Sequence, residues 1–141
     1  MNMAKKTTGQ LINRLTKVRS YSAYLDENRD ELITETTGQY LTRLATEKGL
    51  KISDIAAGAS QTNYTYKIFT DERHPRRDPL IAIAISMGLE LAEAQHLLRI
   101  SHCAQLDPRN SRDSVIIYGL HRKQSTTEIN LLLENHKEEL L

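Results

Sequence analysis

The sequence predicts an all-α fold, and three observations predict it. Apolar residues recur at spacings of three and four along most of the 141-residue chain, as they do on one face of an α-helix. No segment shows the sustained alternation of apolar and polar residues that a half-buried strand requires. Trp is absent and Phe occurs once, so the core must consist of Leu, Ile and Ala with some Tyr, a composition that favours helices.

Length, cysteine content and hydropathy narrow the class of protein. The chain suits one domain of ordinary size with an additional helical layer. Cys103 is the single cysteine and cannot form an internal disulfide, which points to a reducing compartment. No apolar stretch approaches the ~20 residues needed to cross a bilayer, and no apolar run follows Lys5 and Lys6 as it would in a signal peptide. We therefore expect a cytoplasmic protein with no membrane partner.

Residues 1–35 are expected to form a partly helical N-terminal arm. Residues 1–20 carry five Lys or Arg residues and no acid, whereas residues 26–35 carry five acids against Arg29. Leu11, Ile12, Leu15 and Val18 recur at helical spacing within the basic part. The basic part is either solvated or contacts phosphates, and the acidic part is typical of a solvated connector or an exposed helix face.

Residues 36–103 are expected to form the central domain, which begins with one longer helix and two short ones. A helix starts near Thr37 and ends at Gly49, which can take a left-handed backbone conformation. Two shorter helices follow at about 54–59 and 62–69, separated by the polar pair Ser60-Gln61. Ser53 and Gln61 are the predicted N-caps of these two helices.

A basic loop and four further helices complete the chain. The loop Arg73–Arg77 is followed by helices at Leu80–Met87 and from Leu89 or Glu90 to Ile100. Residues 104–141 form a C-terminal helical extension, in which Asp107-Pro108 is the predicted start of one helix and Ser125–Glu128 a capping box for the last. The apolar faces of these two helices, Val115–Leu120 and Ile129–Leu133, are the predicted homodimer contact.

Two short helices joined by a tight polar break have the layout of a helix-turn-helix when a longer helix precedes them and a basic loop follows. The second helix must enter a major groove about 12 Å wide. The first must pack closely on it, which the small residues Ala56–Ala59 allow. The sequence thus predicts a five-helix domain that contains a helix-turn-helix.

The stretch from Tyr40 to Leu98 resembles the Xre-type, lambda-repressor-like family of regulators. From Tyr24 onward the chain is similar to an uncharacterised bacterial subgroup with three motifs. They are Tyr-x-Tyr-x-Ile-Phe (Tyr64–Phe69), Arg-x-Pro-x-Arg-Asp (Arg73–Asp78) and Pro-Arg-Asn-x-Arg-Asp-x-Val-Ile-Ile-Tyr (Pro108–Tyr118). Where the family has glycine, in the turn and after the recognition helix, this chain has Ala59 or Ser60 and then Asp71. Those positions need a positive φ, which glycine adopts freely and Asp tolerates less easily.

The register of the second short helix depends on which motif is aligned. Alignment on Ile55-Ala56 buries Tyr66 and Phe69, whereas alignment on Arg73 and Pro75 buries Thr65 and Ile68. We favour the second, with Tyr64, Ile68 and Phe69 as core residues. The predicted DNA-binding residues are then Gln61, Thr62, Asn63, Tyr66 and Lys67 on the helix, with Arg73, Arg76 and Arg77 in the loop. Gln and Asn pair with adenine edges, Lys with guanine or phosphate, and the loop arginines hold phosphates.

The favoured function is a sequence-specific DNA-binding transcriptional regulator, a repressor in type, which binds double-stranded DNA as a homodimer. The alternative is a protein–protein interaction module on the same scaffold that does not read DNA. Three observations favour it: a net charge of +1, acids at Asp71, Glu72 and Asp78 beside the groove, and the missing glycines. Residues 51–79 carry only a weak positive surplus, with five bases against four acids.

We expect no enzymatic activity, cofactor or metal. The chain has no Walker loop, nucleophile elbow or dinucleotide fingerprint. His96, His102 and Cys103 form the one tight group of candidate ligands, and their spacing fits no common zinc pattern. Arg77 and Asp78 are read as an ion pair near a helix start, and Arg109, Arg112 and Asp113 as a structural cluster.

Overall fold

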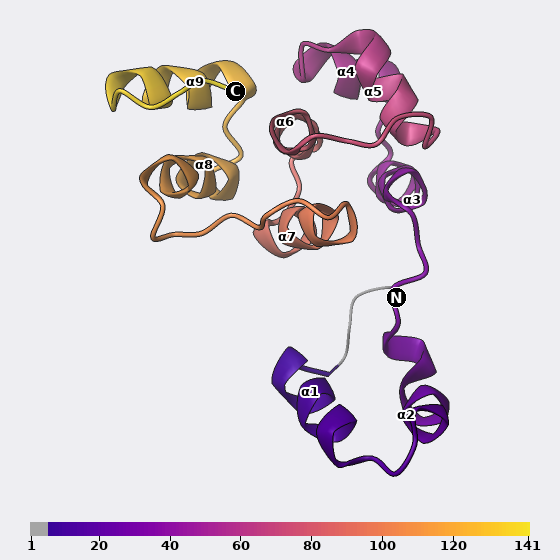
Figure 1. Cartoon of the computed structure of the whole chain (residues 1–141). Coiled ribbons are helices and arrows are strands. Elements are labelled where there is room, and N and C mark those ends of the chain that lie inside the picture. Colours follow the sequence, from indigo (N-terminus) through magenta and orange to yellow (C-terminus); the bar gives the residue numbers. More distant parts are fainter. Residues whose placement is uncertain (1–5) are drawn as a thin grey trace. The chain divides into compact units, whose positions relative to one another are not determined.

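The computed structural model describes residues 6–141 and confirms the all-α prediction, since no strand occurs within those residues. The chain divides into two compact units (Figure 1). Unit 1 ends at Glu35 and unit 2 is Thr36–Leu141. The predicted N-terminal arm thus coincides with unit 1, whereas the predicted C-terminal extension belongs to the same unit as the central helices.

Unit 1 is a pair of helices with a short 3-10 turn. It contains α1 (Thr8–Lys17), α2 (Tyr21–Asn28) and η1 (Arg29–Glu31). Thr7 and Gln10 form a capping box at the start of α1, and the Ser20 hydroxyl accepts from the backbone of α2. Arg14 and Glu27 join the two helices by an ion pair. The predicted helix in the basic arm is confirmed, and the acidic segment begins within α2.

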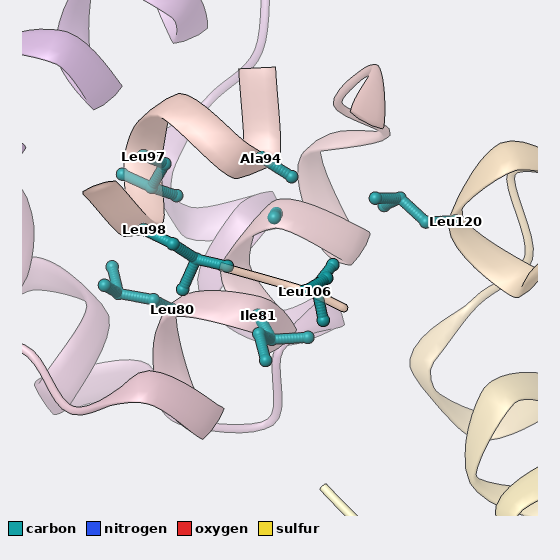
Figure 2. A pocket seen from close by; sticks show the side chains of 8 residues that line it. Leu80, Ile81, Ala94, Leu97, Leu98, Leu106 and Leu120 are labelled. Carbon is teal, nitrogen blue, oxygen red and sulfur yellow. The ribbon is translucent and has the colours of Figure 1, made fainter. Parts of the chain in front are cut away.

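Unit 2 contains seven helices, and α6 is the most completely buried of them. They are α3 (Thr37–Lys48), α4 (Ile52–Gly58), α5 (Thr62–Phe69), α6 (Arg77–Met87), α7 (Leu91–Ile100), α8 (Ser111–His121) and α9 (Thr126–Asn135). From Leu80 to Ile85 every side chain of α6 is buried. Leucine, isoleucine and alanine side chains around α6, α7 and α8 meet in an interior with no room for a water molecule (Figure 2). Such dense packing is normal for a protein core.

The helix ends agree with the sequence where glycine or a capping box marks them. Gly49 and Gly88 follow α3 and α6 with φ of 67° and 63°. The left-handed role predicted for Gly49 is confirmed, and Gly88 ends α6 in the same way. Ser125 and Glu128 form the predicted capping box of α9. These signals are local, which is why they can be recognised from the sequence.

Three predicted helix starts are wrong. Helix α6 begins at Arg77 and not at Leu80, so Arg77 lies in its first turn and not in the basic loop. Helix α4 begins at Ile52, with Lys51 and not Ser53 at the N-cap position. Ile52 packs against the core, and this contact places it in the first turn of the helix. Asp107-Pro108 lies in a turn, where the Asp107 carboxylate accepts from the Arg109 amide at 2.9 Å. Helix α8 starts after Asn110, whose side-chain oxygen accepts from the Asp113 amide at 2.9 Å.

The start of α6 and the start of α8 are joined by crossed ion pairs. The predicted pair of Arg77 with its neighbour Asp78 is wrong: Arg77 binds Asp113 at 2.8 Å and Arg112 binds Asp78 at 2.9 Å. We call these four residues the α6–α8 ion-pair cluster. Arg112 also donates to the Glu139 and Leu140 carbonyls, so the cluster holds the C-terminal segment as well. Arg109 lies outside it, with an exposed side chain 3.9 Å from Asp107.

The apolar faces of α8 and α9, which were predicted to form a homodimer contact, are largely buried inside unit 2. Ile116, Leu120, Ile129 and Leu133 are fully or almost fully buried between α6, α8 and α9. Tyr118 and Leu131 stay exposed. Within residues 6–141, no helix combines the length and the apolar content needed to cross a membrane.

Candidate nucleic-acid interface

Helices α4 and α5 are joined by a turn of three residues, Ala59 to Gln61. Ser60 has a φ of 58°, so the positive-φ position predicted at Ala59 or Ser60 falls on Ser60. Ala56 and Ala59 are buried, as close packing of the two helices requires. Gln61 occupies the predicted N-cap position, but its side chain does not bond to the helix: its amide nitrogen donates to the Pro79 carbonyl at 2.9 Å. The turn is thereby tied to the start of α6.

Helix α5 has one buried face and one exposed polar face. Thr65 and Ile68 have no exposed surface, which confirms the favoured register. Phe69 is also buried, at the last position of the helix. The opposite face presents the side chains that the sequence assigns to the groove, which are Thr62, Asn63, Tyr66 (41% exposed) and Lys67.

Tyr64 holds the basic loop against α5. Its hydroxyl oxygen accepts from the Arg76 amide at 3.0 Å. The guanidinium carbons of Arg73 and Arg76 lie 5.7 and 5.6 Å from the centre of its ring, within the range of cation–π attraction. Tyr64 is half-buried and packs on the core as predicted, but its role as a platform for both arginines was missed. The loop arginines are thereby placed beside the exposed face of α5.

Asp71 joins the end of α5 to the start of α3. Its φ is 59°, as expected where the family has glycine. Its carboxylate accepts from the Gly38 amide at 2.9 Å and from the Thr36 hydroxyl at 2.7 Å. A Cβ at Gly38 would lie 2.4 Å from the Phe69 carbonyl oxygen, so the two segments approach closely. These two hydrogen bonds join residues more than 30 positions apart. The expected positive φ was the one signal in the sequence that pointed to Asp71.

Arg77 does not join the other predicted DNA-binding residues. Its guanidinium donates to both carboxylate oxygens of Asp113, at 3.1 and 2.8 Å. It also donates to the Ala104 and Gln105 carbonyls, at 2.9 and 3.2 Å. These bonds direct the guanidinium into the α6–α8 ion-pair cluster. We therefore define the α5–loop surface without it, as Thr62, Asn63, Tyr66, Lys67, Arg73 and Arg76.

The local charge of this region is the small positive surplus that the sequence indicated. Between residues 51 and 79, one of the five bases (Arg77) and one of the four acids (Asp78) form ion pairs within unit 2. The remaining charged residues are Lys51, Lys67, Arg73 and Arg76 against Asp54, Asp71 and Glu72, all of them exposed. Among the described residues, neither Lys67 nor the two loop arginines has an ion-pair partner.

The arrangement can offer hydrogen-bond donors, a tyrosine and three cations to one ligand. Comparisons of the chain with protein-family models, with curated proteins and with solved structures found no match. The resemblance to the Xre-type family therefore stays a prediction from the sequence.

Proposed function

We propose that this protein is a sequence-specific, double-stranded-DNA-binding transcriptional regulator of the bacterial cytoplasm, a repressor in type. In this proposal α3–α7 form the five-helix lambda-repressor-like domain, α4 and α5 are its helix-turn-helix, and α5 is the recognition helix. One observation carries the proposal: an exposed polar face of α5 beside two arginines that Tyr64 holds in place.

The dimensions and chemistry of α5 support this role. Eight residues make a helix about 12 Å long, and a helix of ordinary diameter fits the B-DNA major groove. Asn63 can pair with adenine, and Lys67 can reach guanine or phosphate. Arg73 and Arg76 can hold phosphates on either side of the groove. Because the Gln61 amide is bonded to Pro79, we assign base reading mainly to Asn63, Tyr66 and Lys67.

The test is the retention of genomic DNA fragments by purified protein at ~0.15 M salt, since low salt favours non-specific phosphate binding. The wild type is expected to enrich fragments that share a motif. The variant K67E/R73E/R76E is expected to enrich none. The control R109E/R122E/K137E changes net charge equally, at exposed positions before α8, after α8 and after α9, and should behave as the wild type. Equal loss in both variants, or no motif with the wild type, would overturn the proposal.

A second candidate function, a protein–protein interaction module, is favoured by a groove between α8 and α9. Its volume is about 320 Å³. It is lined by Ser114, Val115, Tyr118, Leu132 and His136. A partner bound there should survive the K67E/R73E/R76E substitutions and be lost with Tyr118→Ser. The DNA-binding proposal predicts that DNA binding is lost with K67E/R73E/R76E and kept with Tyr118→Ser.

A further inference from the structure

Unit 1 has too little core to be stable alone. Of its described apolar side chains, Tyr24 is the one that is buried. Chains below about 40 residues usually need a disulfide, a metal or oligomerisation to stay folded. The single cysteine of the sequence is Cys103, in unit 2. The helices of unit 1 therefore need another surface to cover their apolar side chains.

The apolar side chains of unit 1 are gathered on α1 and at the two ends of α2–η1. Leu11, Ile12 and Leu15 lie on one face of α1, Val18 follows directly after the helix, and α1 has no buried residue. Ile12 is 55% exposed and Leu15 is 43% exposed. Five of the large apolar side chains that are exposed in the described part of the chain belong to unit 1: Ile12, Leu15, Tyr21, Leu32 and Ile33. Such a face costs free energy in water unless something covers it.

The charges of unit 1 indicate what covers this face. Residues 1–25 contain no acid, and Lys17 and Arg19 lie exposed at the end of α1. The segment α2–η1 is acidic, with Asp26 and Asp30 exposed. Asp26 has a distant ion pair with Arg29 at 3.5 Å, and both side chains are largely exposed. Helix α1 is thus basic at its end and α2–η1 is acidic. The helical hairpin that they form is therefore complementary in charge to a second copy of itself.

We infer that unit 1 is a homodimerisation element. Two hairpins pair about a two-fold axis, so that the apolar face of α1 is covered and its basic end opposes α2–η1 of the second copy. Charge complementarity between two copies selects this occupant over an anionic membrane, which α2–η1 would repel. The C-terminal faces are less suited, because Ile116, Leu120, Ile129 and Leu133 are already buried. The inference stands without DNA binding.

The first test is the mass of the full-length chain in solution, measured by light scattering at about 20 μM protein and 0.05 M salt. The wild type is expected to be a dimer and I12E/L15E a monomer, with dissociation constants at least tenfold apart. Leu131→Glu is the control, because Leu131 in α9 is as exposed as Ile12. A monomeric wild type, or a dimer lost with Leu131→Glu and kept by I12E/L15E, would overturn the inference.

The second test uses charge reversal and does not remove any apolar side chain. K17E/R19E makes the end of α1 acidic, and D26K/D30K makes α2–η1 basic. Each variant alone should be mostly monomeric, because like charges then oppose each other. An equimolar mixture should form a heterodimer, because both opposing pairs are again complementary. Failure of the mixture to associate would overturn the inference. A lower unfolding temperature of unit 2 in monomeric I12E/L15E than in the monomeric wild type would also overturn it, because that result would show that α1 covers unit 2 of its own chain.

Discussion

Asp71 keeps a left-handed backbone conformation because its carboxylate ties the start of α3 to the end of α5. Alanine would lose both hydrogen bonds and keep the backbone strain, whereas glycine would lose the bonds and relieve the strain. Asp71→Ala should therefore lower the free energy of unfolding by about 2–3 kcal/mol. Asp71→Gly should lower it by about 1 kcal/mol less. Urea unfolding followed by circular dichroism measures both, and equal losses would contradict this role of the backbone.

Thr65 carries a buried hydroxyl with no hydrogen-bond partner among the described residues. Thr65→Val removes that hydroxyl without changing the shape of the side chain. The free energy of unfolding should stay unchanged or rise by up to about 1 kcal/mol. Thr37 is the matched control, because its hydroxyl is hydrogen-bonded to Ser101 at 2.7 Å. Thr37→Val should cost about 1–2 kcal/mol, and the same sign for both substitutions would refute the comparison.

Residue-scale predictions from the sequence succeed where the cause is local. The positive φ of Asp71 followed from a position at which the Xre-type family has glycine, and that of Ser60 lies at one of the two positions, Ala59 or Ser60, that the resemblance left open. The partner of Arg77 did not follow, because Asp113 is 36 residues away and the nearer acid Asp78 is taken by Arg112. An adjacent opposite charge is a weak signal when a more buried partner is available.

The α6–α8 ion-pair cluster should make stability depend on pH. Burial raises the pKa of Asp113, but the hydrogen bonds from Arg77 and the Asp107 amide and the charges of both arginines outweigh it, so the pKa lies below its ordinary value. A carboxyl whose pKa is lowered by folding stabilises the fold above its unfolded pKa of about 4. That stabilisation is lost as the pH falls through the folded pKa.

The free energy of unfolding should therefore fall as the pH decreases from about 5 to 2, because Asp113 must be protonated. Asp113→Asn should be less stable than the wild type at pH 7 and should show a shallower pH dependence. Urea unfolding at a series of pH values measures both slopes. Parallel slopes for the two proteins would show that Asp113 does not carry the dependence.

The contact between α3 and the end of α5 has no room for a methyl group. A Cβ at Gly38 would meet the Phe69 carbonyl oxygen, which the backbone holds in place. A Cβ at Gly58 would meet the Ser86 hydroxyl at 2.3 Å, and that side chain can rotate away if it gives up its hydrogen bond to the Ile55 carbonyl. Gly38→Ala should cost about 3 kcal/mol of unfolding free energy, and Gly58→Ala no more than about 1 kcal/mol after its gain in helix propensity. Thermal unfolding of both variants gives the order, and the reverse order would contradict the close approach.

Elements were predicted well from their periodicity and their ends. The helix ends at Gly49 and Gly88 and the capping box of α9 are as expected. The starts of α4, α6 and α8 are not as expected. Tertiary packing of Ile52 decides the start of α4, and the side-chain cap of Asn110 decides the start of α8. Sequence signals thus locate a helix more reliably than its first turn when two capping residues compete.

For the whole molecule, charge and apolar pattern indicated the division at residue 35 but not how α8 and α9 are used. Their wide apolar faces looked like an interface, yet the same faces are needed to cover α6. A pattern of apolar residues shows that a face is covered, not which chain covers it. We therefore place the proposed dimer contact in unit 1 and not on the C-terminal helices.

Selection from a random duplex library at ~0.15 M salt tests directly whether α5 reads DNA sequence. The wild type should select one motif. Asn63→Ala should relax the motif at one base position, with a loss of about 1–3 kcal/mol there. Arg76→Ala should select the same motif with weaker binding and a smaller dependence on salt. If the wild type selects no motif, or Asn63→Ala leaves a wild-type motif unchanged, α5 is not a recognition helix.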